Sequence, residues 1–320
     1  MNDSPEFRLD PFSGDSILLA PGRAAPIVED RVVELPAPNR PCPFCPGREA
    51  DTEGHVARWP AEGTGADWQV RVVRNRYPAV HPNAQDSVHG SAARGAHEVI
   101  VEGRAHEGDL TTFSRDLRRL VLRAYQDRIR VHRGTGHVHL FRNRGRRAGS
   151  SQPHPHAQMI ATAHVGNDAQ RRWKRNTDHF ARTGRTLLAD VLQDELTRKD
   201  RIVQEHDAFV VLCPVAPRFN GETWVVPRRG PSFAECEHVD ALADLLGPLL
   251  RAIATLGRPA YNLVWREPAC AHANDPAAFW TLEIMPRRGP GAGYELSAGT
   301  TMATVRPEDA AAMLRARVRE

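Results

Sequence analysis

Two stretches of the chain repeat the same order of hydrophobic and polar patterns. In the first stretch, apolar and polar residues alternate at strand spacing in segments 68–73, 97–102, 137–141 and 156–160. Between the second and third segments, apolar residues recur at helical spacing at Leu110, Phe113, Leu117, Val121 and Ala124. Asp109 or Thr111 is placed to cap that helix. The first stretch therefore predicts strand, strand, helix, strand, strand.

The second stretch predicts the same order of elements. Its strand-like segments are residues 209–213, 222–227, 261–265 and 280–284. The helix between them has one apolar face, formed by Val239, Leu242, Leu245, Leu246, Leu249 and Ile253. A repeated order of this kind indicates a duplicated α+β fold, in which each half is an antiparallel sheet with one packed helix.

A charged, helix-permissive segment joins the two stretches. It runs from about residue 168 to residue 195, and its larger apolar residues are Trp173, Phe180, Leu187 and Leu188. We expect this segment to be helical and to be anchored by those side chains. The pattern then divides the chain into two domains, residues 1–195 and residues 196–320.

The composition is that of an ordinary globular protein. Hydrophobic residues make up 41% and charged residues 26% of the 320 residues. No apolar run approaches the roughly 20 residues that a membrane span needs. Residues 1–12 also lack the basic and apolar regions of a secretory signal. We therefore expect a cytoplasmic protein that does not associate with membranes.

The basic residues are almost all arginine, because lysine occurs only at positions 174 and 199. The pI is about 9.0, but the net charge is only +4, and acidic residues are interspersed nearly everywhere. This distribution does not favour a nucleic-acid partner. One local exception is the run of arginines at residues 142–147. Such a run suits phosphate binding through paired hydrogen bonds, and it is equally compatible with an ordinary solvated loop.

Two of the five cysteines are close together in the sequence. Cys42 and Cys45 lie in the segment PCPFCPG, whereas Cys213, Cys236 and Cys270 are scattered. The Cys-x2-Cys spacing among prolines and glycine is typical of a zinc knuckle. A redox pair usually opens a helix after a strand, which makes that alternative weaker. A metal-free loop is the third interpretation.

A zinc knuckle of two cysteines needs two further ligands. We expect both to be histidines of the first half of the chain, for which the candidates are His55, His97, His106, His132, His137, His139 and His154. The spacing of these residues does not choose among them.

The segment SSQPHPHAQ places two histidines, His154 and His156, on either side of a proline. It is either a polar turn or a site in which the two imidazoles have fixed and different roles. A histidine that attacks phosphorus needs a free ring nitrogen, a fixed ring and donors for the phosphate oxygens. Ser151 and Gln158 lie within this segment and Asn143 lies just upstream. These neighbours favour a catalytic site with His156 as nucleophile.

The second stretch has no counterpart of this motif. At the corresponding place, Phe279, Trp280 and Thr281 lead into the last strand-like segment. The cysteine pair and the arginine-rich run are also confined to the first half. This asymmetry predicts one chemical site, located in the first half and supported by the second.

Several segments, in order along the chain, resemble those of one family. They are residues 8–14 with 18–23, the Cys-x2-Cys segment 42–47, the segment VVRNRYPA at 72–79, the histidine motif at 149–158, and residues 293–296 and 307–309. On these motifs the chain resembles the galactose-1-phosphate uridylyltransferase branch of the histidine-triad superfamily, which includes the plant-type ADP-glucose phosphorylases. The resemblance covers nearly the whole chain and implies that each half has a histidine-triad-like fold.

The resemblance implies a ping-pong transfer of a nucleoside monophosphate, most simply UMP in galactose metabolism. His156 would attack the α-phosphorus of a nucleotide sugar, and a second sugar phosphate would then accept the nucleotide. Ser151, Gln158 and Asn143 match positions that hold the phosphates, and Asn75 matches a position near the ribose. Positions matching sugar-phosphate recognition are Arg23, Tyr294 and Glu295.

The resemblance also implies a zinc site and a homodimer. The ligands would be Cys42, Cys45, His106 and His154, with His97 as the less suitable histidine. Classical members of the family have histidines for another metal in the last strand of the second half. Residues 279–284 contain none, so we expect a second metal site to be absent.

Three classes of function compete. A nucleotidyltransferase passes the nucleotide to a phosphate-bearing acceptor, and within this class adenylyl transfer or phosphorolysis is the alternative to uridylyl transfer. A histidine-triad hydrolase passes it to water. A non-catalytic nucleotide-binding protein is disfavoured because the residues of the nucleophile site are all present.

Overall fold

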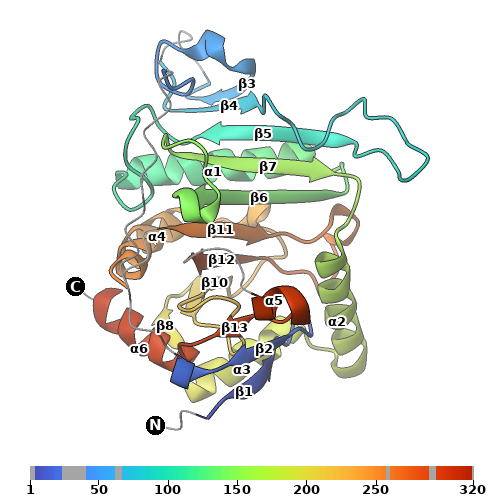
Figure 1. Ribbon diagram of the computed structural model, residues 1–320, viewed down its shortest axis with the longest axis vertical. Coiled ribbons are helices and arrows are strands. Elements are labelled where there is room, and N and C mark those ends of the chain that lie inside the picture. The colour runs from blue at the N-terminus through green and yellow to red at the C-terminus, as the bar shows by residue number, and fades with distance from the viewer. Residues whose placement is uncertain (1–3, 24–40, 62–66, 257–259, 288–292, 319–320) are drawn as a thin grey trace.

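The computed structural model describes residues 4–23, 41–61, 67–256, 260–287 and 293–318. Its centre is an antiparallel sheet of ten strands (Figure 1). Across the sheet the strands are β3 (Glu53–Trp59), β4 (Val70–Arg74), β5 (Gly95–Val101), β7 (His156–Thr162), β6 (His137–Arg144), β11 (Tyr261–Arg266), β12 (Thr281–Pro286), β10 (Thr223–Pro227), β9 (Phe209–Leu212) and β8 (Ile202–Glu205).

This strand order shows how the two halves of the chain meet. The first-half order β3-β4-β5-β7-β6 is followed by β11-β12-β10-β9-β8, which is the same order reversed. The halves join through β6 and β11, where Asn143 pairs with Asn262 and Phe141 with Val264. Backbone hydrogen bonding therefore continues through the junction, and the two copies share one sheet. The boundary at residue 195 stays a prediction, because the sheet itself does not divide there.

Long helices cover the back of the sheet. These are α1 (Arg115–His132) in the first half and α4 (Val239–Ala254) in the second, and α6 (Pro307–Val318) packs against α4 and β8. Alternate strand residues such as Leu140, Met159 and Leu263 face the helices and are fully buried. A fully buried leucine or methionine contributes about 1.5–3 kcal/mol relative to an exposed one, so this layer is the main core.

Helix α1 begins later than the sequence pattern predicts. Asp109 accepts hydrogen bonds from the backbone and hydroxyl of Thr111, and its carboxylate also pairs with Arg144. This turn precedes the helix, and Ser114 is the actual N-cap, accepting from the backbone N–H of Leu117 at 3.2 Å. The prediction of a cap at Asp109 or Thr111 was wrong because a local turn uses those side chains.

The connecting segment forms two helices, α2 (Asn167–Thr183) and α3 (Leu187–Arg198). They are separated at Gly184, which has a φ of 69° and ends α2. Leu188 and Leu192 of α3 pack on Val210 and Trp224, on the front of the second half. The front of that half is therefore covered by helices.

The amino-terminal strands also lie over the second half. Strands β1 (Glu6–Leu9) and β2 (Ser16–Leu19) form a small sheet with β13 (Met302–Ala303), next to helix α5 (Gly293–Ala298). The front of the first half is covered differently, because there the loop with Phe44 packs on Trp68, Val99 and Val101. No helix of the described residues is long and apolar enough to cross a membrane.

Candidate active site and metal centre

The loop between β6 and β7 leads the chain back into the sheet at the histidine motif. Strand β6 ends at Arg144, and Gly145 and Gly149 have φ values of 79° and 87° on either side of a short 3₁₀ helix. Only glycine adopts such angles without steric cost. The carbonyl of Pro155 accepts from the backbone N–H of Glu102 at 3.0 Å, which extends the β5–β7 pairing to the residue before His156. The backbone at Pro155 and His156 is therefore held by its pairing with β5.

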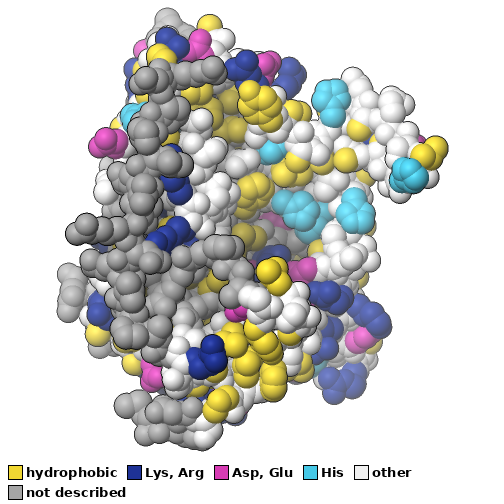
Figure 2. All heavy atoms as spheres, viewed as in Figure 1, with side chains coloured by type: hydrophobic (Ala, Val, Ile, Leu, Met, Phe, Trp, Pro, Cys, Tyr) yellow, Lys and Arg dark blue, Asp and Glu magenta, His cyan; other side chains and the backbone are white. Residues whose placement is uncertain are grey.

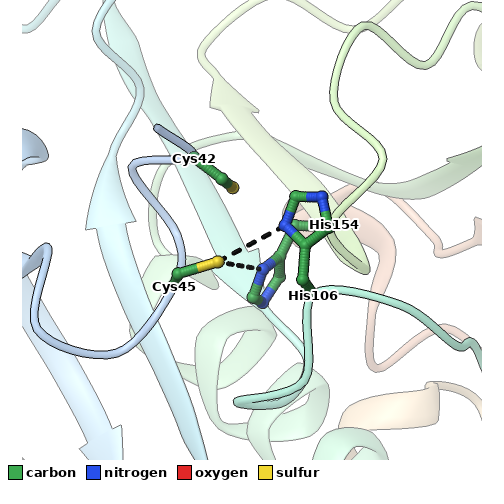
Figure 3. A group of neighbouring side chains, drawn as sticks. All are labelled: Cys42, Cys45, His106 and His154. Carbon is green, nitrogen blue, oxygen red and sulfur yellow. Dashed lines mark hydrogen bonds between the residues drawn. The ribbon is translucent and has the colours of Figure 1, made fainter. Parts of the chain in front are cut away.

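Four potential metal ligands converge beside the motif. Donor atoms of Cys42, Cys45, His106 and His154 all lie within 4.8 Å of one another. Figure 3 shows the four side chains pointing toward a common centre, from the cysteine turn, the segment after β5 and the segment before β7. Of the seven candidate histidines, the structure brings His106 and His154 to the cysteines.

The distances within this group fit zinc. The Sγ atom of Cys45 lies 3.3 Å from Nδ1 of His106 and 3.7 Å from Nδ1 of His154. A tetrahedral zinc ion with bonds of about 2.3 Å to sulfur and 2.0 Å to nitrogen separates those atoms by roughly 3.6 Å. The donor set and the spacing therefore suit a structural zinc ion.

The side chain of His154 is prepared to act as a ligand. Its Nε2–H donates to the carbonyl of Gly103 at 2.8 Å, which leaves the Nδ1 lone pair facing the sulfur atoms. Burial lowers the pKa of His154 to about 4, and the hydrogen bond to Gly103 only partly opposes this. A neutral, oriented imidazole with a backbone acceptor behind it is the usual form of a metal-bound histidine.

The ring of His156 is held in the form that a nucleophile needs. His156 is 7% exposed, and its Nδ1–H donates to the backbone carbonyl of His154 at 2.8 Å. Because Nδ1 carries the proton, Nε2 keeps its lone pair. Burial lowers the pKa of His156, so the ring is neutral at physiological pH. The centroid of the Phe44 ring lies 5.5 Å from that of the His156 imidazole, and the two rings pack together.

A buried ion pair supports the strands on either side of the motif. Arg142 of β6 donates to both carboxylate oxygens of Glu102, at 2.8 and 3.0 Å, and Tyr125 of α1 also donates to that carboxylate. Arg142 and Glu102 are 2% and 0% exposed. Arg142 is therefore engaged behind the sheet, and Arg144 pairs with Asp109. Of the arginine-rich run, these two side chains are not directed at a phosphate on the front face.

Gln158 lies two residues after His156 on the same face of β7. Its Oε1 atom is 2.9 Å from Nε2 of His97 and 3.4 Å from Nδ2 of Asn75. His97 comes from β5, and Asn75 directly follows β4. The structure therefore places Asn75 and Gln158 in contact, and their roles at the nucleoside and the phosphates stay predictions.

From the sequence, His97 was expected to be no more than a weaker candidate for a metal ligand. The structure places it at Gln158, away from the cysteines. A signal was present in the alternation of β5, because His97 lies two and four residues before Val99 and Val101 and so shares their face. Knowledge of the β5–β7 register, which pairs Val101 with His156, was needed to use it.

Two further phosphate-binding candidates lie close to the motif. Asn143 is on β6, and its Oδ1 accepts from Nδ2 of Asn262 at 2.7 Å. It lies two residues beyond Phe141, which pairs with Gln158, so the two amides share the front face. Ser151 is exposed in the loop before β7.

The candidates for sugar-phosphate recognition lie elsewhere in the chain. Arg23 is exposed at the end of a short 3₁₀ helix after β2. Tyr294 and Glu295 are on α5, which Figure 1 places beside β2 and β13 over the second half. Within one chain, the structure therefore groups these three residues with the small sheet and not with β7.

The second half has a different arrangement on its front face. Glu283 of β12 is completely buried, and it pairs with Arg218 at 2.7 Å, Arg266 at 2.9 Å and Arg172 at 3.9 Å. Burial alone would raise the pKa of Glu283, but the three guanidinium groups outweigh it and hold the pKa far below its usual range. A carboxylate engaged in this way is already neutralised.

A cavity of about 480 Å³ lies between α2 and the front of the sheet. Its lining includes His137 and His139 of β6, Trp173 and His272, whose rings stack at 4.0 Å. Figure 2, which shows this face, has histidine side chains over the first-half strands and basic side chains around α2. The cavity therefore lies over the junction of the two halves, where β6 meets β11, and is separate from the group of Cys42, Cys45, His106 and His154.

Comparison with known proteins gives consistent matches. Residues 1–166 match the model of the family described as galactose-1-phosphate uridyl transferase, N-terminal domain. An ADP-glucose phosphorylase of Arabidopsis thaliana is 30% identical, with 98% of this chain and 93% of that protein covered. A probable galactose-1-phosphate uridylyltransferase of Drosophila melanogaster is 26% identical, with 89% and 85% covered.

A solved structure agrees with these matches. The crystal structure of an ADP-glucose phosphorylase from Arabidopsis thaliana with bound ADP-glucose has a TM-score of 0.84 and 27% identity, and the match covers 98% of this chain and 99% of that one. The expected duplicated α+β fold of the histidine-triad type is thereby confirmed.

Proposed function

Because the chain belongs to the galactose-1-phosphate uridyl transferase family, we propose that it is a nucleotidyltransferase in which His156 carries the nucleotide between two substrates. The observation that carries this proposal is the state of the His156 ring. Its Nδ1–H donates to the carbonyl of His154, which leaves Nε2 unprotonated, and Gln158 lies two residues further along the same face of β7. A fixed and neutral imidazole of this kind is what attack on phosphorus requires.

The proposed reaction has two in-line displacements. In the first, Nε2 of His156 bonds to the α-phosphorus, and the bond from that phosphorus to the bridging oxygen breaks, so that a sugar phosphate leaves with the electron pair. In the second, a phosphate oxygen of the acceptor attacks the same phosphorus and the P–N bond breaks. The positive charge on the nucleotidyl-imidazole is stabilised by the Nδ1–H bond to His154. Gln158, Asn143 and Ser151 are proposed to bind the phosphate oxygens.

A zinc ion bound by Cys42, Cys45, His106 and His154 would serve structure in this scheme. It would tie the cysteine turn to the segments before β7 and after β5, and so fix the His154 carbonyl against His156. The turn also carries Phe44, which packs on both histidine rings of the motif.

Two nucleotides are candidates for the group that is transferred. The sequence motifs favour UMP, whereas the full-length match to an ADP-glucose phosphorylase, and the similar structure with bound ADP-glucose, favour AMP equally well. Uridylyl transfer between hexose 1-phosphates and adenylyl transfer from ADP-glucose are therefore the two candidates.

The recognition residues that lie apart from β7 fit the expected homodimer. Arg23, Tyr294 and Glu295 are grouped over the second half of the same chain. We propose that a second copy brings such residues to the site, which predicts that the active species measured by light scattering is a dimer.

A donor panel tests the function. The intact protein is incubated with UDP-glucose, UDP-galactose, ADP-glucose or GDP-glucose, and its mass is measured. We expect an increase equal to one nucleotidyl group, whose mass identifies the base. Adding a hexose 1-phosphate or inorganic phosphate should then discharge the group. Rapid discharge by water alone would favour the hydrolase, and no increase with any donor would contradict the proposal.

A further inference from the structure

The side-chain amide of Gln158 can bind a phosphate in only one of its two orientations. Its NH₂ group donates hydrogen bonds to phosphate oxygens, whereas its oxygen would repel them. The two ends are nearly equal in size, so packing does not distinguish them. Gln158 is only partly buried. The orientation must therefore be set by hydrogen bonds, and the partners of Oε1 decide it.

A backbone amide determines which nitrogen of His97 carries the proton. The N–H of Ala79 donates to Nδ1 of His97 at 3.0 Å. A backbone N–H is always a donor, so Nδ1 must be the acceptor, and the proton of the neutral ring is on Nε2. That Nε2–H donates to Oε1 of Gln158 at 2.9 Å. The backbone N–H of Ala79 therefore determines that the imidazole of His97 donates to the side-chain oxygen of Gln158.

Asn75 forms a second relay, meaning a chain of two hydrogen bonds that also begins at a backbone N–H and ends at Oε1 of Gln158. The backbone N–H of Tyr77 donates to Oδ1 of Asn75 at 2.8 Å, which directs the Nδ2 group of Asn75 to Oε1 of Gln158 at 3.4 Å. Nδ2 of Asn75 and Nε2 of His97 are 3.1 Å apart because both donate to this one oxygen. No residue of the described part of the chain accepts from the Gln158 NH₂ group.

We propose that His97 is a positioning residue that locks the Gln158 amide with its NH₂ group toward the substrate phosphate. The proposal rests on the proposed function, since Gln158 is there the phosphate-binding residue. Both relays begin in the turn at residues 75–79, which is the expected nucleoside-binding turn. His97 thereby connects the turn that receives the nucleoside to the residue that holds the phosphate, and the stronger of the two contacts on Oε1 is its own.

Two substitutions at this position separate the two contacts of the ring. In His97→Asn, the side chain reaches the position of Nδ1 and loses the donor to Gln158. In His97→Gln, the longer side chain places an amide N–H near the position of Nε2 and keeps that donor. We expect His97→Asn to slow formation of the nucleotidyl-enzyme about ten- to a hundredfold, with a smaller change in donor affinity. His97→Gln should recover most of the rate.

A double-variant cycle tests whether His97 acts through Gln158. In the Gln158→Met background no amide remains to be oriented, so adding His97→Asn should cause no further loss of rate. Equal losses in both backgrounds would overturn the proposal, since they would show a general structural role. His164→Asn, which changes an exposed histidine after β7, is the matched control and should keep the wild-type rate.

The ring tautomer can be measured without any reaction. In the full-length protein with ¹⁵N-labelled histidine, NMR should show His97 neutral, with Nε2 protonated and Nδ1 not. The opposite tautomer would overturn the proposal, whatever the activity of the enzyme. If the expected tautomer is found and no nucleotide sugar labels the protein, the proposed function fails while the locked amide stands, so the two failures are distinguishable.

Discussion

The two halves of the sheet place opposite chemistry on corresponding strands. Strand β7 presents the neutral imidazole of His156, the proposed nucleophile, and the neutral amide of Gln158 on the front face, where the loop with Phe44 packs beside them. Strand β12 presents Glu283, a carboxylate enclosed by arginines beneath α2 and the amino-terminal segment. Each strand occupies the same place in its half of the sheet. A duplicated backbone therefore does not imply duplicated chemistry, because the side chains on corresponding strands differ in charge and in the groups that pair with them.

The polar groups of the two halves also differ in what they leave unpaired. In the first half, Nε2 of His156 and the NH₂ group of Gln158 remain available, while the remaining atoms of both side chains are fixed. In the second half, Glu283 is paired with three guanidinium groups, and its partner Arg218 is also paired with the buried carboxylate of Glu222. We therefore expect substitutions of His156 and Gln158 to affect the reaction and substitution of Glu283 to affect stability.

The largest effect should come from the nucleophile. His156→Ala should reduce label transfer from an α-phosphate-labelled nucleotide sugar by about a thousandfold or more, because the substitution removes the imidazole that is proposed to attack phosphorus. The circular dichroism spectrum should be unchanged. Thr281→Ala, at the corresponding strand of the second half, is the control and should still be labelled. Full labelling of His156→Ala would contradict the proposal that His156 is the nucleophile.

Removal of a zinc ligand should affect both metal content and stability. Cys42→Ser should lower bound zinc to near zero and lower the free energy of unfolding by several kcal/mol, since binding energy of a structural ion is folding energy. Metal analysis and denaturant unfolding measure the two. Cys270→Ser, which changes a partly buried cysteine of the second half, should alter neither. Purified wild-type protein without metal would contradict the assignment.

The buried carboxylate of the second half should matter for stability alone. Glu283→Gln removes a fully buried carboxylate from between three arginines, which keep only their other partners Glu222, Asp10 and Asp168. Breaking a buried ion pair in this way lowers the free energy of unfolding by about 3–5 kcal/mol. Labelling per folded molecule should stay at the wild-type rate. Glu205→Gln, which removes an exposed partner of Arg228, should change stability by less than about 1 kcal/mol. A matching loss of labelling in Glu283→Gln would show that the halves are not separable.

A smaller and pH-dependent effect is expected at Glu267. Burial raises the pKa of its carboxyl to about 7, and hydrogen bonds from Ser232 and the N–H of Phe233 only partly oppose this. The folded state therefore favours the protonated form, and its stabilising contribution is present below the unfolded pKa of about 4.5 and lost as the pH rises through 7. The free energy of unfolding of Glu267→Gln, relative to that of the wild type, should therefore rise by about 2.5 kcal/mol between pH 5 and pH 8. A pH-independent difference in unfolding free energy would contradict the shifted pKa.

Local motifs made much of the site predictable from the sequence. The cysteine pair and the histidine motif are short, and their chemistry follows from spacing over a few residues. The choice of His106 from seven histidines came only with the family resemblance, because the residue reaches the cysteines through the β5–β7 pairing. The position of His97 depends on the same register together with the turn after β4.

The central strands and helices were predictable and the edges were not. Strands β7 and β11 have a strong periodic pattern and were placed within two residues at each end. Strand β3 is interrupted by register shifts at His55, so its sequence does not alternate cleanly. Strand β2 pairs with β13 across almost the whole chain, and no local pattern encodes such a contact. Gly184, which divides α2 from α3, was passed over because a single glycine is tolerated in a helix pattern.

The most direct test of whether His156 carries the nucleotide is to locate the covalent group. The wild-type protein is treated with the donor that labels it, digested, and examined by tandem mass spectrometry under alkaline conditions, in which a phosphoramidate survives. We predict one nucleotidyl group, on Nε2 of His156, which is released by mild acid. A group found on His154, on Ser151 or on any residue of the second half would contradict the claim that the chemistry belongs to His156 alone.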